Sequence, residues 1–317
     1  MLNPILFLYF IIFTSSALPL AQLASTSKVL AQFGDKIEKD ERVAKYEFQS
    51  VLSEAGPFGN VYLASIKGDS SKSIIIKVAN PADVIISNEY EAYNPCWSYD
   101  EQKNIGSKSS FVLEPIENIP ISFEKEKTYF CLVVMERALA VLDQPLFSDK
   151  TPEFIVKNTK ALTKFILQTI EGVKDIHTSQ FINNDLKLSN ILLVNESSKD
   201  PVIIDDELLT AQESKEIPYK AVINDFDVIA NLKLDVKLEN HEEIMTKIKN
   251  NYGQLKKIIQ ELMSCNQEFI DSKHIMNRLE WIIENNIDEE NVFFNNEIKN
   301  QPKSRRRLLM HRKQTYI

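Results

Sequence analysis

The 317-residue sequence predicts an α+β fold in which a small sheet-rich lobe is followed by a mostly helical lobe. Two observations carry this prediction. Between residues 45 and 138, five strand-like segments follow one another closely, which favours an antiparallel five-stranded sheet. After about residue 140, apolar residues recur at helical spacing instead. The charged fraction of 26% and the apolar fraction of 44% are ordinary for a globular protein.

The first three strands are expected at residues 45–52, 59–68 and 73–79. Apolar and polar residues alternate in the first two, as in a strand with one buried face. Because only short turns separate the three, they should form an antiparallel meander.

A helix is expected over residues 83–94, where Pro95 ends it. Two more strands follow at 111–121 and 128–138. The second contains the continuous apolar run "YFCLVVM", so it should lie in the centre of the sheet with both faces buried. These segments complete the sheet-rich lobe with its one helix.

The remaining chain alternates amphipathic helices with short strands. Helices are expected at 161–177, 252–263 and 274–286, each with one apolar stripe. Short strands are expected at 190–194 and 221–229. Ligands often bind in the cleft between two such lobes.

The N-terminal residues resemble a targeting segment. An apolar run from Pro4 to Phe13 precedes Ser15 and Ala17, which fit the small-x-small rule for signal-peptide cleavage. A membrane span needs about twenty apolar residues. A cleaved signal peptide, an uncleaved signal anchor and a buried N-terminal helix are therefore all considered, and the first two direct the chain to the secretory pathway. The sequon at Asn195 suits secretion.

Composition excludes some classes. The pI of about 5.3 and the net charge of −8 argue against a nucleic-acid binder, which needs a basic face. The three cysteines, Cys96, Cys131 and Cys265, are widely spaced, so neither a zinc site nor a disulfide framework is expected. Cys131 lies in the apolar run and is expected to be a buried core residue.

Two features of the sheet-rich lobe point to phosphate binding. Gly56 and Gly59 lie between the first two strands, where backbone N–H groups can approach phosphate oxygens closely. Lys77 lies among isoleucines and valine in the third strand, and a charge there is costly unless it is paired or faces a cleft. A carboxylate of the following helix, Glu89 or Glu91, could hold it.

The strongest chemical signal is "FINNDLKLSNILLV". Asp185, Lys187 and Asn190 project from one loop whose apolar ends anchor it in the core. A carboxylate, a cation and an amide are the groups that phosphoryl transfer requires for orienting a hydroxyl, holding the phosphoryl group and binding magnesium. Asp225, at the end of a later strand, supplies a second oxygen ligand. His177 should only pack or cap at its helix end.

These segments, in this order, resemble the eukaryotic protein kinases over roughly residues 45–285. "GPFGNV" resembles the glycine-rich loop, "IIIKV" the lysine strand and "NEYEAY" the helix of the small lobe. "HTSQFINNDLKLSNILL" resembles the catalytic loop, and "VINDFD" resembles the metal-binding motif. The resemblance implies a bilobal protein-kinase-like fold with ATP and Mg²⁺ as cofactors.

The resemblance also implies a role for each matching residue. Asp185 would orient the attacking hydroxyl and accept its proton, and Lys187 would stabilise the transferring phosphoryl group. Asn190 and Asp225 would bind Mg²⁺. The nucleotide-binding residues would be Gly56, Gly59, Val61, Lys77, Glu89, Met135, Glu136 and Ala138.

Several positions depart from the family pattern. Glu54 replaces the first loop glycine, Asn183 and Asn184 replace the His-Arg pair of the catalytic loop, and Asp227 replaces the glycine of the metal motif. Asp205 also ends an apolar segment and competes with Asp225 as metal ligand. A protein Ser/Thr kinase is the leading interpretation. A pseudokinase that binds nucleotide or protein is the main alternative, and a small-molecule kinase is the third.

The expected domain organisation follows from these matches. The basic tail could bind an acidic partner or a membrane surface, or could simply be solvated. The expected segments are a signal peptide or anchor at 1–24, a linker or short helix at 25–43, a small lobe at 44–138, a large lobe at 139–295 and the basic tail at 296–317.

Overall fold

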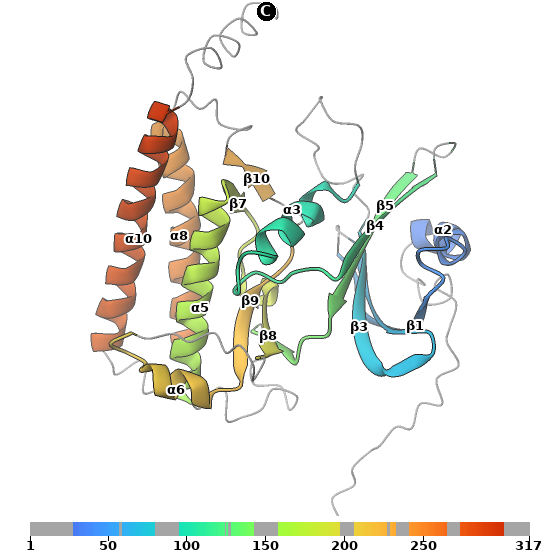
Figure 1. Cartoon of the computed structure of the whole chain (residues 1–317), viewed down its shortest axis with the longest axis horizontal. Coiled ribbons are helices and arrows are strands. Elements are labelled where there is room, and N and C mark those ends of the chain that lie inside the picture. The colour runs from blue at the N-terminus through green and yellow to red at the C-terminus, as the bar shows by residue number, and fades with distance from the viewer. Residues whose placement is uncertain are drawn as a thin grey trace, which may run out of the picture.

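The computed structural model has an α+β fold (Figure 1). Its described residues form one five-stranded antiparallel sheet, two small sheets and six α-helices. The structure describes residues 28–56, 59–79, 95–123, 125, 128–142, 158–196, 206–226, 229–232, 241–264 and 273–300.

The five-stranded sheet confirms the expected antiparallel strands. The strand order is β1-β2-β3-β5-β4, so the first three strands form the expected meander and β5 lies between two neighbours. Residues 130–135 of β5 are buried, as the continuous apolar run predicted. The strands are β1 (Tyr46–Gly56), β2 (Gly59–Ile66), β3 (Asp69–Ala79), β4 (Glu117–Phe123) and β5 (Thr128–Glu136).

The alternation of β3 divides its side chains between two faces of the sheet. Ile74, Ile76 and Val78 belong to one apolar cluster, which also includes Phe130 and Leu132 of β5. Side chains between them point to the opposite face, where Lys77 lies. The alternation in β3 therefore places Lys77 on the face of the sheet opposite the cluster of Ile74, Ile76 and Val78.

Helix α2 (Lys28–Glu38) covers one face of this sheet. Its Phe33 stacks on Phe123 with ring centroids 4.8 Å apart, and Ile37 is fully buried. Of the two expectations for residues 25–43, a linker or a short helix, the structure has a helix, and it is part of the core.

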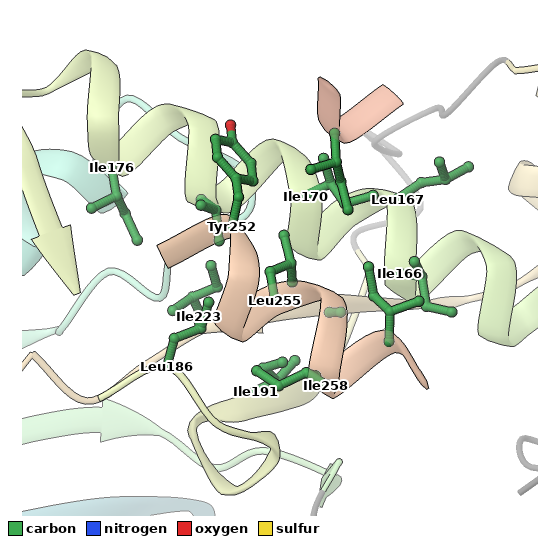
Figure 2. Packing of buried hydrophobic residues seen from close by; sticks show 14 of the residues in the cluster. Ile166, Leu167, Ile170, Ile176, Leu186, Ile191, Ile223, Tyr252, Leu255 and Ile258 are labelled. Carbon is green, nitrogen blue, oxygen red and sulfur yellow. The ribbon is translucent and has the colours of Figure 1, made fainter. Parts of the chain in front are cut away.

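The second half of the chain builds a separate apolar core around α5 (Figure 2). Ile166 and Ile170 of α5 meet Leu255 and Ile258 of α8 in this core. The helices are α5 (Thr159–Thr178), α6 (Ala211–Glu216), α8 (His241–Ser264) and α10 (Lys273–Asn300). The small sheets are β10 (Ile229–Asn231) with β7 (Phe181–Asn183), and β6 (Ala140–Val141) with β8 (Ile191–Asn195) and β9 (Tyr219–Ile223).

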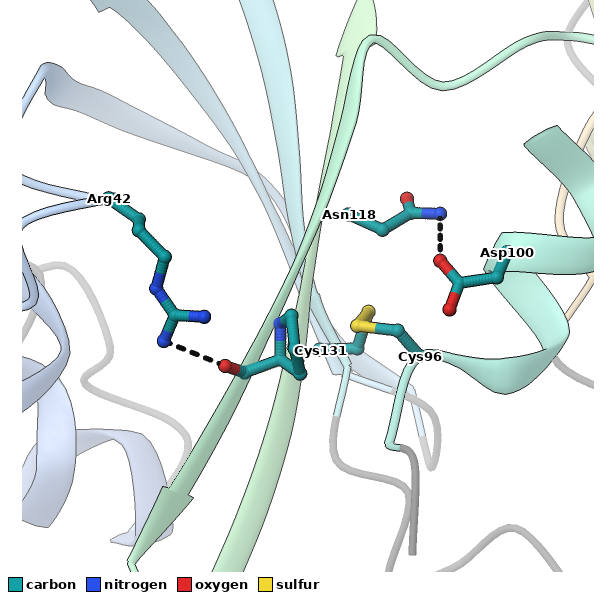
Figure 3. The surroundings of a disulfide bond; sticks show 6 residues. Arg42, Cys96, Asp100, Asn118 and Cys131 are labelled. Carbon is teal, nitrogen blue, oxygen red and sulfur yellow. Dashed lines mark hydrogen bonds between the residues drawn. A yellow bond between two sulfur atoms is a disulfide. The ribbon is translucent and has the colours of Figure 1, made fainter. Parts of the chain in front are cut away.

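Helix α3 (Trp97–Gly106) was not expected from the sequence, and a disulfide ties it to the sheet. Cys96, directly before α3, bonds to Cys131 of β5 (Figure 3). The expectation of no disulfide was therefore wrong, because the two cysteines are 35 residues apart in sequence and only the fold brings them together. Cys131 is buried, as expected.

Residues 111–116 differ from the expected strand over 111–121, since β4 begins only at Glu117. Val112 instead forms a parallel bridge with Ile223 of β9. A Cβ on Gly172 of α5 would lie 2.9 Å from both the Phe111 carbonyl oxygen and Ile223 Cδ1. The segment after α3 is thus held between α5 and β9, and this requires a glycine in α5.

Some expectations fall outside the described residues. They are the N-terminal leader, the helix over 83–94, and the basic tail beyond residue 300. Among the helices that the structure does describe, none has the length and apolarity needed to span a membrane.

Candidate functional site

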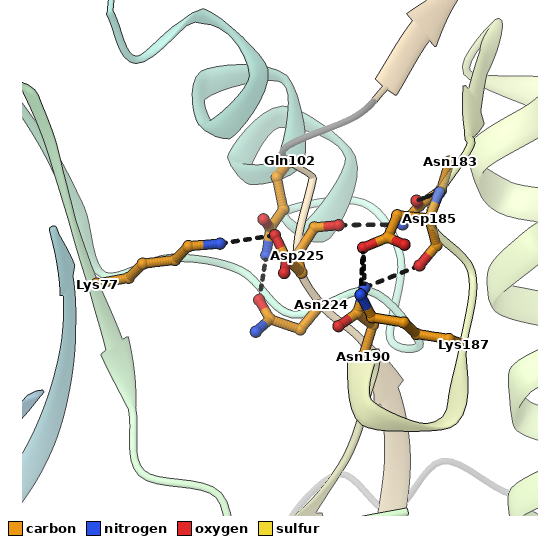
Figure 4. A network of polar contacts seen from close by, with 8 residues as sticks. All are labelled: Lys77, Gln102, Asn183, Asp185, Lys187, Asn190, Asn224 and Asp225. Atoms are coloured by element: carbon orange, nitrogen blue, oxygen red, sulfur yellow. Dashed lines mark hydrogen bonds and ion pairs between the residues drawn. The ribbon is translucent and has the colours of Figure 1, made fainter. Parts of the chain in front are cut away.

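Polar side chains from three parts of the chain meet beside β3 (Figure 4). Lys77 comes from β3, and Asp225 is the second residue after β9. Asp185, Lys187 and Asn190 come from the loop between β7 and β8. One network of hydrogen bonds and ion pairs connects the three parts.

Lys77 forms an ion pair with Asp225 across 148 residues of sequence. Its Nζ lies 2.8 Å from Asp225 Oδ1, and the two side chains are only 9% and 20% exposed. The Nζ also lies 5.6 Å from the centre of the Tyr99 ring of α3. The low exposure makes this pair stronger than a surface pair, since water screens it less.

The backbone at Asp225 is in the left-handed region, with φ of 64°. Few residues other than glycine adopt this conformation, although aspartate and asparagine do so more readily than most. Asn183 Nδ2 donates to the Asp225 carbonyl oxygen at 3.2 Å. Unfavourable backbone conformations persist where surrounding contacts hold them, and they gather at functional sites.

The loop from β7 to β8 is held in shape by its own polar groups. Lys187 Nζ lies 2.6 Å from Asp185 Oδ2. Asn190 Nδ2 donates to the Asp185 carbonyl oxygen at 2.8 Å and to its Oδ2 at 3.1 Å. Leu186 and Leu188 are buried between these polar residues. The alternation of apolar and polar residues therefore anchors the loop while its polar side chains gather on the other side.

Two bonds join the loop and the end of β7 to the segment that carries Asp225. The Asn224 N–H donates to the Asn190 carbonyl oxygen at 2.8 Å. Asn183 Oδ1 accepts from the Asp185 N–H at 2.9 Å, while its Nδ2 holds Asp225. Asn183 thus contacts both aspartates.

A series of buried hydrogen bonds connects Asn183 to Glu290 of α10. Asn251 Nδ2 donates to the Asn183 carbonyl oxygen at 2.8 Å. Asn251 Oδ1 lies 2.9 Å from His177 Nε2, and His177 Nδ1 lies 2.9 Å from Glu290 Oε2. Tyr252 donates to Glu290 Oε1, and burial, followed by the Glu290 charge, raises the pKa of this phenol. His177 does pack at its helix end, as expected, and it bonds through both ring nitrogens.

The other expected nucleotide-binding positions lie along the large sheet. Gly56 pairs with Gly59 at the end of the β1–β2 ladder, and Val61 pairs with Lys77. Met135 ends the buried part of β5, and Glu136 is exposed. Ala138 packs against the apolar cluster that joins this sheet to β8 and β9.

Four expected or competing positions lie outside the described residues: Glu89, Glu91, Asp205 and Asp227. Within the described ranges, no group of three or more histidine, cysteine, aspartate and glutamate side chains could hold a metal ion. The oxygen donors near one another at the site are those of Asp185, Asn190 and Asp225.

Sequence reasoning missed Gln102 of α3 and gave Asn183 no favourable role. Asn183 was seen only as a departure from a family pattern, yet its side chain contacts both aspartates. Gln102 donates to the Asn224 side chain. The loop and helix α3 both contain several other polar side chains, so no sequence signal distinguished these two amides.

A search of known protein-family models found no match to this chain.

Proposed function

We propose that the protein is an ATP- and Mg²⁺-dependent phosphotransferase, a protein kinase acting on Ser or Thr. The single observation that carries this proposal is the Lys77–Asp225 ion pair at 2.8 Å, in one network with Asp185 and Asn190. Distant segments that converge in this way supply the cation, the oxygen ligands and the base that phosphoryl transfer uses.

The corresponding fold proposal is a bilobal protein-kinase-like fold. The five-stranded sheet with α2 and α3 would be the small lobe, and the helical core around α5, α8 and α10 would be the large lobe. In support, Lys77 lies on the third strand and the loop with Asp185 follows the long helix α5, in the order that the family resemblance implies.

The oxygen donors at the site fit Mg²⁺. This ion prefers hard oxygen ligands and often takes only one or two from protein, with phosphate and water filling its other positions. Asn190 Nδ2 is engaged with Asp185, which orients the amide so that Oδ1 is the atom available to a cation. Asn190 and Asp225 would hold the ion, and it would neutralise phosphate charge.

Lys77 would contact the phosphates from the side of the sheet. It lies opposite Val61 of β2, and β2 begins at Gly59, which pairs with Gly56. Backbone N–H groups at such a turn and an ammonium group both favour phosphate oxygens.

Asp185 and Lys187 would serve the transfer itself. The bond from the terminal phosphorus to the leaving diphosphate oxygen breaks, and a bond to the acceptor hydroxyl oxygen forms. The hydroxyl proton passes to an Asp185 carboxylate oxygen, and the Lys187 ammonium stabilises the moving phosphoryl charge. Their separation of 2.6 Å keeps both groups at one point, where most of the rate gain comes from positioning.

Transfer of label from γ-labelled ATP to a general protein acceptor such as casein tests the proposal. Asp185→Ala should lower incorporation at least about 100-fold, as expected for loss of a general base. Asp288→Ala, which removes an exposed aspartate of α10, is the matched control and should not lower it. Equal incorporation by wild type and Asp185→Ala would refute the role of Asp185. Label found only in small molecules would favour the small-molecule kinase instead.

A pseudokinase is the second candidate, and the departures at Glu54, Asn183 and Asn184 favour it. In this case wild type would be stabilised by Mg²⁺ and ATP in a thermal-shift assay without any transfer of label. Asp225→Ala and Asp205→Ala should differ in this assay. Loss of the metal-dependent shift only in Asp205→Ala would show that our choice of metal ligand is wrong.

We also propose that the protein enters the secretory pathway, where it is secreted or held at a membrane by its N-terminal segment. The Cys96–Cys131 disulfide supports this, because disulfides persist in oxidising compartments. The sequon residue Asn195 is exposed at the end of β8. When the full chain is expressed in eukaryotic cells, endoglycosidase treatment should increase its electrophoretic mobility, and the mobility of Asn195→Gln should not change. A cytosolic, unglycosylated wild-type chain would contradict the proposal.

A further inference from the structure

Helix α3 contacts the site through one buried amide side chain. Gln102 is fully buried, and its Nε2 donates to the Leu113 carbonyl oxygen at 2.9 Å and to Asn224 Oδ1 at 3.0 Å. The carbonyl partner can only accept, so it fixes which end of the Gln102 amide faces Asn224. Figure 4 shows Gln102 reaching Asn224 beside Asp225.

Asn224 is the residue through which Gln102 could affect both expected metal ligands. It directly precedes Asp225, whose backbone has a φ of 64°. Its own N–H donates to the Asn190 carbonyl oxygen at 2.8 Å. A change in the position of Asn224 would therefore move Asp225 and Asn190 relative to each other.

Three contacts fix α3 in the position that Gln102 needs. The Cys96–Cys131 disulfide holds the beginning of α3 against β5. At the end of the helix, a Cβ on Gly106 would lie only 2.8 Å from the Glu114 Cα, so the helix crosses the following segment closely. That segment is bonded to β9, since the Leu113 N–H donates to the Ile223 carbonyl oxygen at 2.9 Å.

We propose that Gln102 is a positioning residue for Asp225 and Asn190, and that the Cys96–Cys131 disulfide anchors the helix from which it acts. Gln102 touches no nucleotide or acceptor. It holds Asn224, and through Asn224 it sets the geometry of the two oxygen ligands. The part of this proposal that concerns phosphoryl transfer rests on the proposed function. The part that says Gln102 holds Asn224 in place does not.

The chain offers a matched control for Gln102. Gln168 of α5 is also a fully buried glutamine that bonds to the β9 segment, because its Oε1 accepts from the Ala221 N–H at 2.8 Å. Among the described residues, no hydrogen bond joins Gln168 to Asn224. Gln102→Met and Gln168→Met therefore remove similar side chains from the core, but only the first releases Asn224.

The test combines hydrogen exchange at single amides with the metal dependence of activity, both on the full chain. In Gln102→Met the backbone N–H of Asn224 should exchange with solvent up to about tenfold faster than global unfolding accounts for. This is expected because the side chain of Asn224 loses the hydrogen bond that holds the residue in place. The Mg²⁺ concentration for half-maximal activity should rise several-fold, while the rate at saturating Mg²⁺ and ATP stays near that of wild type. Gln168→Met should show neither change.

Removal of the Cys96–Cys131 disulfide tests whether this bond anchors α3. The double variant Cys96→Ser, Cys131→Ser should speed exchange at the Asn224 amide as Gln102→Met does. If Gln102→Met does not fold, Asn224→Ala breaks the same bond from the partly exposed side and should raise the Mg²⁺ requirement in the same way.

An Asn224 amide that exchanges at the wild-type rate in Gln102→Met would overturn the inference, and so would an unchanged amide in the double cysteine variant. Wild type without any phosphoryl transfer would contradict the proposed function alone, since the exchange measurement still decides what Gln102 supports.

Discussion

The ion pair between Lys164 of α5 and Glu196 after β8 gives the sharpest prediction of stability. Lys164 Nζ lies 2.6 Å from Glu196 Oε2, and the two side chains are 0% and 5% exposed. The same Nζ donates to the carbonyl oxygens of Ser214 at 2.9 Å and Ile217 at 2.8 Å. Lys164→Met therefore removes the ammonium group that contacts a buried carboxylate and two carbonyl oxygens.

The expected cost follows from these contacts. Removing one partner of a buried pair costs about 3–5 kcal/mol of the free energy of unfolding, and we expect Lys164→Met in this range. Glu196→Gln keeps a hydrogen-bond acceptor but removes the charge, so it should cost about 2–3 kcal/mol. The double variant should be less destabilised than Lys164→Met alone, because no unpaired charge remains in the core.

Urea unfolding followed by tryptophan fluorescence measures these differences, provided that the unfolding transition is two-state. Lys256→Met is the matched control, since Lys256 lies 3.8 Å from Glu284 and the two side chains are 36% and 70% exposed. It should cost no more than about 1 kcal/mol. A Lys164→Met variant as stable as this control would show that the buried pair does not stabilise the fold, and a double variant whose cost equals the sum of the single costs would show that the two side chains do not interact.

Three further predictions concern packing, titration and the disulfide. Gly172→Ala should lower the free energy of unfolding by about 1–3 kcal/mol, because its Cβ would lie 2.9 Å from the Phe111 carbonyl oxygen. Gly253→Ala should raise the free energy of unfolding by up to about 1 kcal/mol, because no neighbouring atom lies within 4 Å of its Cβ. Equal urea midpoints for the two variants would show that α5 can move away from Phe111. Burial raises the pKa of Asp175, so the folded state binds its proton more readily than the unfolded chain does. The free energy of unfolding should therefore fall as the pH rises above about 4, the ordinary pKa of an aspartate, with a smaller slope in Asp175→Asn, and an unchanged slope would exclude Asp175 as its source. Non-reducing mass spectrometry of a proteolytic digest should recover Cys96 linked to Cys131, and a digest in which both are free would contradict the bond.

The large sheet could be predicted because its strands carry their pattern locally. Alternation in residues 45–79 gave the meander, and the apolar run at Phe130–Met135 identified the buried central strand. The helices with apolar stripes were predicted for the same reason, since the stripe on α5 is what packs against α8. Local pattern therefore predicted these elements, although α8 begins 11 residues earlier and α10 ends 14 residues later than expected.

The disulfide and helix α3 could not be predicted, because each depends on tertiary structure. Cys96 and Cys131 meet only when β5 lies beside the start of α3. Helix α3 is polar over much of its length, and its four buried residues, Ser98, Tyr99, Gln102 and Ile105, include few that mark an apolar stripe. The contacts of Gln102 with Leu113 and Asn224 become visible only in the folded chain.

At the site, Lys77, Asp185, Asn190 and Asp225 were selected from the sequence, and the structure brings them into one network. The helix carboxylates that were expected to hold Lys77, Glu89 and Glu91, lie outside the described residues. The structure pairs Lys77 with Asp225, the residue expected to bind the metal, and this pairing was not expected. Sequence spacing cannot show this, since the two residues are 148 positions apart.

We have proposed that Lys77, Asn190 and Asp225 form one site for ATP and a divalent ion. A crystal structure of the wild-type chain with a non-hydrolysable ATP analogue and Mn²⁺, which can be located by its anomalous signal, tests this directly. We predict a metal peak about 2.1 Å from Asn190 Oδ1 and an Asp225 carboxylate oxygen, with Lys77 Nζ contacting phosphate. A metal bound elsewhere, or an unchanged Lys77–Asp225 pair with the analogue absent from the site at saturating concentration, would show that these three residues do not form the nucleotide site.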